Sequence, residues 1–418
     1  MEVTLGFGKK SVICSIDDEN FIGQLLPNKI DHGLKGEDEV KRALKQPIGT
    51  PLLSEIVKPG EKIAIITSDI TRPMPSRVVL PIILEELERA GVNHQDIIVI
   101  FALGSHRKHT EDEMKELVGT DVFSKIKCID SDVNECETLG STSRGTPVSL
   151  FRPLLQADRR ICLGNIEYHY FAGYSGGAKA IMPGASTRQT IQANHSMMIK
   201  DDAKAGALDD NSLRCDIEEV TDYIPIDFIL NVVLDEKKEI INAVAGHHKE
   251  AHREGCKYLD RLYKVKIDKL ADIVIVSPGG FPKDINVYQA QKALDNAKHA
   301  VKEDGIIIWV ASCNEGLGED VFERWINEAD SPEALIDRVR TNFELGGHKA
   351  AAIAMVLQKA RVFLVSDLDK DYVRNAFLEP YDTLDEAVNQ ALKIMGSNSG
   401  ILVMPYGGST LPVIKIHK

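Results

Sequence analysis

The sequence lacks three features that would each point to a particular class of protein. Its seven cysteines are scattered singly, with no Cys-x-x-Cys pair, which favours free thiols and a cytoplasmic location. No window reaches the roughly 18 apolar residues of a membrane-spanning helix, and no basic run precedes an apolar segment near Met1. The formal net charge of -13 disfavours a nucleic-acid partner, because phosphate binding needs a basic face.

A dinucleotide-binding fingerprint, Gly-x-Gly-x-x-Gly after an early strand, is also absent, which disfavours a nicotinamide-type dehydrogenase. The 418 residues are too many for one ordinary core, and a composition of 43% hydrophobic and 27% charged residues is typical of a globular enzyme. We therefore expect two domains, a small-molecule ligand and no membrane partner.

Short apolar runs alternate with amphipathic segments along the chain. These runs are residues 62–66, 97–103, 160–163, 272–276, 305–310 and 361–365. Strands that alternate with helices predict parallel sheets, whereas residues 228–245 predict a hairpin that closes the first half. The predicted fold class is α/β: two α/β domains with mainly parallel sheets and an interdomain active-site cleft, divided near residue 265.

Two polar segments follow neighbouring predicted strands. Asp69-Ile70-Thr71-Arg72 comes after the first strand, and Gly104-Ser105-His106-Arg107 comes after the second. Ligands of open α/β sheets collect at the carboxyl edge of the strands, so this edge is a candidate binding site. A surface loop that leads into a helix is the alternative for the first segment.

A glycine-rich stretch carries the strongest chemical signal. Ser175-Gly176-Gly177-Ala178-Lys179 predicts a tight turn that only glycine tolerates, with Lys179 as a nucleophile or a partner for an anion. His169 lies shortly before it. His169 and His106 are the candidate acid and base, because imidazole titrates near neutral pH, although a lone histidine is more often structural.

Other histidines suggest metal chemistry less clearly. His195 lies in a helix expected over residues 186–199 and is either a metal ligand or a solvent-facing residue. No second ligand lies near it at a familiar spacing, so a metal held by His195 would need ligands that are not protein. His248 and His252 have the spacing of a helical metal pair, but their charged neighbours favour a solvated helix face.

A predicted helix in the second half begins near Tyr288-Gln289-Ala290-Gln291-Lys292. Gln289 and Lys292 are three residues apart and would share one face of that helix. The face could hold a substrate carboxylate, and an ordinary exposed polar face is the alternative.

Taken together, these motifs resemble the nickel-pincer lactate racemase family and its 2-hydroxyacid racemase and epimerase relatives. The resemblance spans the whole chain, and the motifs occur in family order. They are residues 69–73, 104–107, 168–179 with His195, 288–292 and 405–410.

The resemblance implies a cofactor, the pyridinium-3,5-bisthiocarboxylic acid mononucleotide nickel complex, which binds covalently to Lys179 and is made by separate biosynthesis proteins. His195 matches the nickel ligand, and His106 and His169 match the acid/base pair. The resemblance further assigns residues 400–418 to the first domain, so that the two domains are 1–265 with 400–418, and 266–399. The implied cofactor-binding residues are Lys179, Asp69, Thr71, Arg72, Gly176 and Gly177, and the implied substrate residues are Arg72, Tyr288, Gln289 and Lys292.

The implied reaction inverts C2 of a 2-hydroxyacid. One histidine removes the hydroxyl proton while the C2 hydride moves to the pyridinium ring, a 2-keto acid forms, and return of the hydride to its other face gives the opposite enantiomer. Lactate-specific members place a tryptophan beside the substrate after the turn at Gly347, where this chain has three alanines, Ala350 to Ala352. A larger 2-hydroxyacid is therefore an alternative to lactate. A non-catalytic carrier of the nickel nucleotide and a nicotinamide-type dehydrogenase are the alternative functions.

Overall fold

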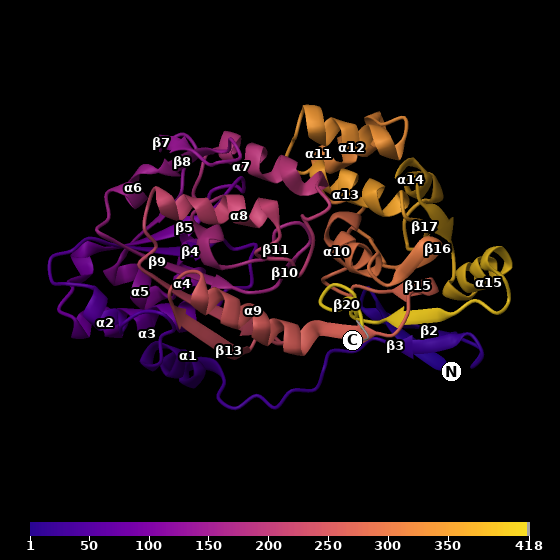
Figure 1. The fold of residues 1–418 in the computed structure, drawn as a ribbon, viewed down its shortest axis with the longest axis horizontal. Coiled ribbons are helices and arrows are strands. Elements are labelled where there is room, and N and C mark those ends of the chain that lie inside the picture. The colour runs from indigo at the N-terminus through magenta and orange to yellow at the C-terminus, as the bar shows by residue number, and fades with distance from the viewer. Residues whose placement is uncertain (416–418) are drawn as a thin grey trace. The chain divides into compact units, whose positions relative to one another are not determined.

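The computed structural model describes residues 1–415 of the chain, which form two compact units. One unit, Ile30–Asp260, comes from the middle of the chain and is called the middle unit below. The other combines Met1–Lys29 with the chain from Arg261 onward and is called the terminal unit. Each unit is an α/β fold with one large sheet, which confirms the predicted fold class (Figure 1).

The middle unit is built on a six-stranded sheet with the order β13-β12-β9-β4-β5-β6. All neighbouring pairs are parallel except β12 with β13, which form the antiparallel hairpin that the sequence predicted. The strands are β4 (Ile63–Ser68), β5 (Ile97–Ala102), β6 (Lys127–Asp130), β9 (Arg159–Asn165), β12 (Phe228–Leu234) and β13 (Ile240–Gly246). Two small hairpins add β7 (Cys136–Ser141) with β8 (Pro147–Phe151), and β10 (Tyr168–His169) with β11 (Gly173–Tyr174).

Apolar side chains of helices pack on this sheet and form its core. Ile63 and Ile65 of β4 are fully buried in a cluster that includes Val40 of α1 and Val79 and Ile83 of α3. The helices are α1 (Gly36–Lys45), α2 (Leu53–Ile56), α3 (Ser76–Arg89), α4 (Glu111–Val118), α5 (Thr120–Lys125), α6 (Arg152–Leu155), α7 (Arg188–His195), α8 (Ser212–Glu218) and α9 (Glu250–Tyr263). Short 3-10 helices span His94–Asp96, Gly177–Ala180, Ser196–Ile199 and Glu219–Asp222.

The terminal unit has a second six-stranded sheet with the order β18-β17-β16-β15-β19-β3, and all of its neighbouring pairs are parallel. Its strands are β3 (Phe21–Gln24), β15 (Ala271–Val276), β16 (Val301–Val310), β17 (Ala360–Val365), β18 (Glu379–Tyr381) and β19 (Ile401–Met404). Two further pairs are β1 (Glu2–Phe7) with β2 (Lys10–Ser15), and β14 (Lys264–Ile267) with β20 (Leu411–Ile414). The helices are α10 (Val287–Ala297), α11 (Asp320–Glu328), α12 (Pro332–Thr341), α13 (His348–Leu357), α14 (Lys370–Asn375) and α15 (Leu384–Met395).

The structure divides the chain differently from the predicted domains, 1–265 with 400–418 and 266–399. The boundary at Asp260 lies close to the predicted one, but both ends of the chain belong to the terminal unit. The four residues of β19 are buried and pair with β15, and β3 pairs with β19 in turn. Parallel strands need partners that are distant in sequence, so local patterns could not reveal this pairing. Residues 416–418 of the predicted segment lie outside the described residues.

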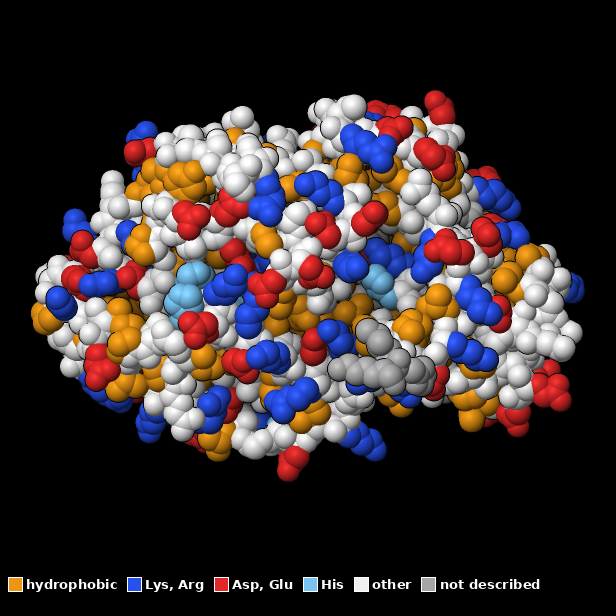
Figure 2. All heavy atoms as spheres, viewed as in Figure 1, with side chains coloured by type: hydrophobic (Ala, Val, Ile, Leu, Met, Phe, Trp, Pro, Cys, Tyr) orange, Lys and Arg blue, Asp and Glu red, His pale blue; other side chains and the backbone are white. Residues whose placement is uncertain are grey.

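Side chains cap two of the helices. Thr110 accepts a hydrogen bond from the Glu113 backbone in the capping box of α4, and Ser331 caps α12. All seven cysteines are free thiols. Across residues 1–415, we find no helix with both the length and the apolar character needed to cross a membrane. Figure 2 shows acidic and basic side chains interspersed over the visible face.

A substitution of Asn20 can test whether the N-terminal segment belongs to the terminal unit. Its side-chain Nδ2 donates to the carbonyls of Ser397 (2.7 Å) and Ser399 (2.9 Å) beside β19. Asn20→Ala should destabilise this unit by about 1–3 kcal/mol, because buried carbonyls lose their donor. Both tryptophans of the chain lie in this unit, so urea unfolding followed by tryptophan fluorescence measures the effect. The exposed neighbour variant Glu19→Ala is the control, and an unchanged midpoint for Asn20→Ala would contradict the assignment.

Candidate active site

The loop after β4 and the loop after β5 are joined by hydrogen bonds at the carboxyl edge of the middle sheet. His106 Nδ1 lies 3.2 Å from Asp69 Oδ2 and 3.4 Å from Thr71 Oγ1. The Thr71 backbone N–H donates to Asp69 Oδ1 at 2.8 Å. The structure therefore brings together three residues that the sequence placed on two separate loops.

Asp69 is almost fully buried, with 4% of its surface exposed. Burial alone would raise its pKa, but the hydrogen bond from His106, the charge of that ring and the hydrogen bonds from Thr71 lower the pKa of Asp69 to about 2. The carboxylate is thus ionised at neutral pH and accepts the Nδ1 proton of His106. Because a neutral imidazole carries one proton, His106 Nε2 is left as a base.

A second histidine of the same loop, His109, also supports this edge, and sequence reasoning missed it. Its side chain is buried, with Nδ1 2.6 Å from Asp130 Oδ1 at the end of β6. Its Nε2 accepts the backbone N–H of Ile70 at 3.0 Å. His109 therefore connects the ends of three adjacent strands and holds the loop that carries Asp69 and Arg72.

The glycine turn before Lys179 has the conformation that the sequence predicted. Gly176 and Gly177 have positive φ angles of 79° and 61°, a region that side chains disfavour. A Cβ atom on Gly176 would lie 2.7 Å from Asn231 Oδ1, and one on Gly177 would lie 2.7 Å from Arg214 Nη2. Both the backbone angles and the close neighbours therefore require glycine at these two positions.

Buried side chains hold the polar backbone groups of this turn. Asn231 Oδ1 accepts the Gly177 N–H at 2.8 Å, and Arg214 donates to the carbonyls of Tyr174 and Gly176 at 3.3 Å. His252 Nε2 lies 2.8 Å from the Ser175 carbonyl oxygen. None of these three side chains was predicted to be part of the site. They come from α8, β12 and α9, which are distant in sequence.

His252 corrects the prediction of a solvated helix face. The residue is fully buried, as are Cys256 and Leu259 further along α9. These three residues recur at the spacing of one helix face. That apolar stripe was a signal in the sequence, and the charged residues between its members obscured it.

Lys179 follows the turn and is half-buried. Burial lowers the pKa of its amine, and the guanidinium groups of Arg72 and Arg214 lower it further, to about 7. The carboxylates of Glu167 and Asp69 act in the opposite direction and are outweighed. About half of the amines are therefore uncharged at neutral pH. The uncharged amine is the nucleophilic form.

His169 and His195 lie along a chain of ring contacts. The Phe171 ring is 4.4 Å from the His169 ring and 4.8 Å from the His195 ring, measured between centroids. His169 Nδ1 accepts the Ala172 backbone N–H at 3.3 Å, so the neutral ring carries its proton on Nε2.

His195 is buried at the last residue of α7, so the alternative of a solvent-facing residue is wrong. Its Nδ1 lies 3.0 Å from Asn194 Oδ1, and Asn194 in turn donates to Asp216 at 2.7 Å. A contact of this kind at Nδ1 fixes the orientation of the imidazole ring. Over the described part of the chain, no group of three His, Cys, Asp or Glu side chains could hold a metal ion.

The candidate substrate residues of the second half lie on α10 of the terminal unit, where the sequence predicted a helix. Gln289 is exposed and Lys292 is half-buried. The Lys349 amine donates to the Tyr288 carbonyl at 2.6 Å and lies 3.9 Å from the centre of the Tyr288 ring. The three alanines after Lys349 are 0–2% exposed within α13, so helix packing accounts for their small size.

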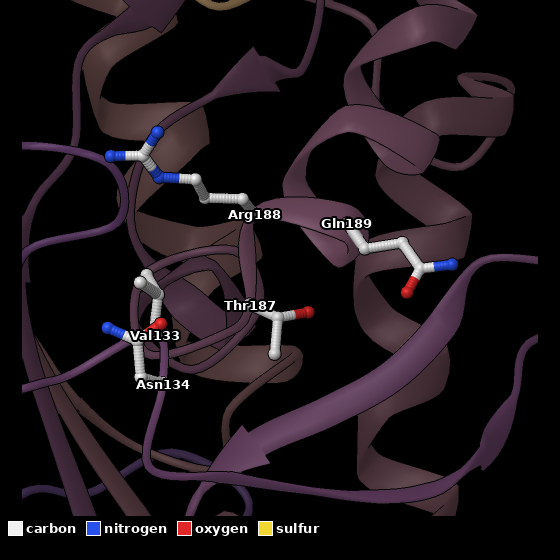
Figure 3. A pocket seen from close by; sticks show the side chains of 5 residues that line it. All are labelled: Val133, Asn134, Thr187, Arg188 and Gln189. Carbon is white, nitrogen blue, oxygen red and sulfur yellow. The ribbon is translucent and has the colours of Figure 1, made fainter.

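A surface pocket lies at the start of α7 (Figure 3). It is lined by Val133, Asn134, Thr187, Arg188 and Gln189. These five residues include none of the predicted site residues, and the N-cap Thr187 already accepts the Thr190 N–H at 3.2 Å. The candidate active site is therefore the cluster around Lys179 rather than this pocket.

Comparison with known proteins identifies the family of the chain. The family model for the lactate racemase N-terminal domain matches residues 7–206, and the model for the lactate racemase C-terminal domain matches residues 266–412. The chain therefore belongs to the lactate racemase family and is an enzyme of the racemase class, an isomerase. This confirms the resemblance found in the motifs.

Individual relatives match over nearly the whole chain. A lactate racemase from Thermoanaerobacterium thermosaccharolyticum is 35% identical and covers 98% of both chains. One from Lactiplantibacillus plantarum is 34% identical and covers 97% of this chain and 98% of the relative. The structure of the T. thermosaccharolyticum lactate racemase apoprotein superposes with a TM-score of 0.90 at 34% identity over all of both chains. A Thermotoga maritima protein shares the fold at 18% identity and a TM-score of 0.65, covering 92% of this chain and all of that one.

Because of the buried Asp69 carboxylate, the free energy of unfolding should fall when the pH is lowered into the acidic range. Its pKa lies below the ordinary value of about 3.9, so its contribution is present above pH 4 and is lost as the pH falls towards 2. Between pH 6 and pH 3 the wild type should lose about 1 kcal/mol more stability than Asp69→Asn. Urea unfolding followed by circular dichroism at both pH values measures this difference. Asp31→Asn, at an exposed position, is the control, and equal losses in wild type and Asp69→Asn would contradict the assignment.

Proposed function

We propose that this chain racemises a 2-hydroxyacid, with lactate as the substrate, using a nickel-pincer nucleotide attached to Lys179. The observation that carries the proposal is a lysine amine whose pKa is lowered to about 7, next to a glycine turn that buried side chains hold in place. The relatives named lactate racemase support the substrate. The reducing environment that seven free thiols favour supports a cytoplasmic location, where separate biosynthesis proteins would supply the cofactor.

The residues present fit this cofactor. One buried histidine, His195, would serve as a protein ligand, and the described residues provide no cluster of three protein ligands. This donor set suits a metal whose other ligands come from an organic group. Lys179 would attach the nucleotide, while Asp69, Thr71, Arg72 and the two glycines would contribute to its binding site. When bound, the nickel-pincer nucleotide supplies a pyridinium carbon that accepts a hydride and returns it.

His106 and His169 would move the hydroxyl proton of the substrate. Asp69 holds the Nδ1 proton of His106, so His106 Nε2 accepts a proton. The Ala172 N–H binds His169 Nδ1, so His169 Nε2 carries a proton. These two contacts place the proton on Nε2 of His169 and on Nδ1 in the neutral form of His106. One ring offers a base and the other offers a donor, as a reaction on two enantiomers requires.

Cationic and polar side chains would hold the substrate. Arg72 can bind a carboxylate through two parallel hydrogen bonds, and Lys292 can add a second positive charge. Tyr288 and Gln289 of α10 stay predicted substrate residues. The buried alanines of α13 favour lactate over the larger 2-hydroxyacid that their sequence position suggested.

Two other functions remain as alternatives. A non-catalytic carrier of the nickel nucleotide would need Lys179 and His195 but has no use for a histidine positioned by a buried carboxylate. The Asp69–His106 contact therefore favours an enzyme. A nicotinamide-type dehydrogenase would need the nucleotide fingerprint that the sequence lacks.

The direct test is racemisation by cofactor-loaded protein. Starting from either enantiomer of lactate, chiral chromatography should detect both enantiomers. His106→Gln and His169→Gln should each lower the rate by about 100-fold or more. His94→Gln is the matched control, because His94 lies just before β5 whereas His106 lies just after it. Loaded protein without turnover would support the carrier, and turnover only with free NAD would support the dehydrogenase. Turnover of larger 2-hydroxyacids alone would refute lactate as the substrate.

A further inference from the structure

Arg214 of α8 lies beneath the glycine turn, on the side opposite to solvent. Only 1% of its surface is exposed. Its Nη1 donates to the carbonyls of Tyr174 and Gly176, and its Nη2 also donates to Gly176, each at 3.3 Å. The guanidinium group therefore fits against the backbone of the turn so closely that Gly177 has no space for a side chain.

The Glu218 carboxylate binds Arg214 but neutralises its positive charge only in part, because Arg253 binds the same carboxylate. Its Nε lies 2.8 Å from Glu218 Oε1, and the same carboxylate binds Arg253 at 2.7 and 2.9 Å. Burial would raise the pKa of Glu218, but Arg214 and Arg253 lower it to about 2, so the carboxylate is ionised. The buried guanidinium of Arg214 and the partly buried guanidinium of Arg253 thus share one carboxylate, and the Lys249 amine lies 3.8 Å from it. Arg253 has a second partner, Asp209, whose side chain is 70% exposed.

His252 adds no charge to this network. It is fully buried, and its Nδ1 lies 3.3 Å from Arg214 Nη2. Burial and the neighbouring Arg214 charge hold the pKa of His252 well below its usual range, so the ring is neutral at physiological pH. The fixed positive charge behind the turn therefore comes from the arginines.

We propose that Arg214 is a positioning residue for Lys179: it fixes the turn that presents the amine and places a buried positive charge against the backbone of that turn. The inference deepens the proposed function, because it rests on Lys179 as the attachment residue. The charged groups that act on the Lys179 amine are Arg72, Arg214, Glu167 and Asp69. The side chain of Arg214 also binds the turn backbone, at the carbonyls of Tyr174 and Gly176.

The test uses cofactor-free protein, so it does not depend on loading or turnover. Trace acetylation with isotope-labelled acetic anhydride, followed by peptide mass spectrometry, gives the reactivity of Lys179 at each pH from 6 to 11. The wild-type reactivity should be half-maximal near pH 7. Arg214→Gln keeps an amide donor for the carbonyls but removes the charge, and should move this midpoint up by roughly one pH unit or more. Arg214→Lys keeps the charge and should move it much less.

Two controls separate this role from a general loss of structure. Lys204, an exposed lysine of the same unit, should keep its profile in every variant. If Arg214→Gln does not fold, the double variant Arg214→Gln with Glu218→Gln removes both buried charges and should show the same upward shift. A folded variant without Arg214 whose midpoint equals that of wild type would overturn the inference. A wild-type midpoint near 10.4, the ordinary value for lysine, would also overturn it. Neither result bears on whether the cofactor is attached to Lys179.

Discussion

The arrangement of the site depends on one electrostatic constraint, the cost of keeping a charged lysine beside two arginines and partly out of water. This cost destabilises the charged form of Lys179, so the amine loses its proton near neutral pH. The turn before Lys179 sets the position of its amine, and this position lowers the pKa. Two glycines allow the backbone to pass close to Arg214 and Asn231, and those two side chains hold the turn in place. Any side chain on Gly177 would disturb the position and the charge state of the amine together.

The parallel sheet of the middle unit explains why the remaining groups lie near one another. The loops after β4 and β5 meet at the same sheet edge, so Asp69 binds His106 directly. His109 and Asp130 add the end of β6 to this arrangement. The chemistry therefore depends on strand order as much as on residue type, because each strand end contributes a different polar group to one place.

Much of this could be predicted from the sequence. Apolar runs bounded by glycine and polar residues located the strands, and the parallel arrangement brought Asp69 and His106 to one edge. The groups that were missed act through tertiary contacts. Asn231 lies within an apolar strand, Arg214 follows no motif, and His252 lies among charged neighbours. Nothing local distinguishes Asn231 and Arg214 from ordinary residues, and the charged neighbours of His252 obscure the buried stripe to which it belongs. The same limit applies to β19, whose partner β15 is more than a hundred residues away in the chain.

The most direct measurement is the intact mass and nickel content of the protein after co-expression with the pincer-biosynthesis enzymes. Wild type would be compared with Lys179→Ala, with the exposed-site variant Lys204→Ala as the control. A covalently bound cofactor predicts a mass increase and about one nickel per chain in wild type and Lys204→Ala, and neither in Lys179→Ala. An unmodified wild-type chain without nickel, under conditions in which a known lactate racemase is loaded, would contradict attachment at Lys179.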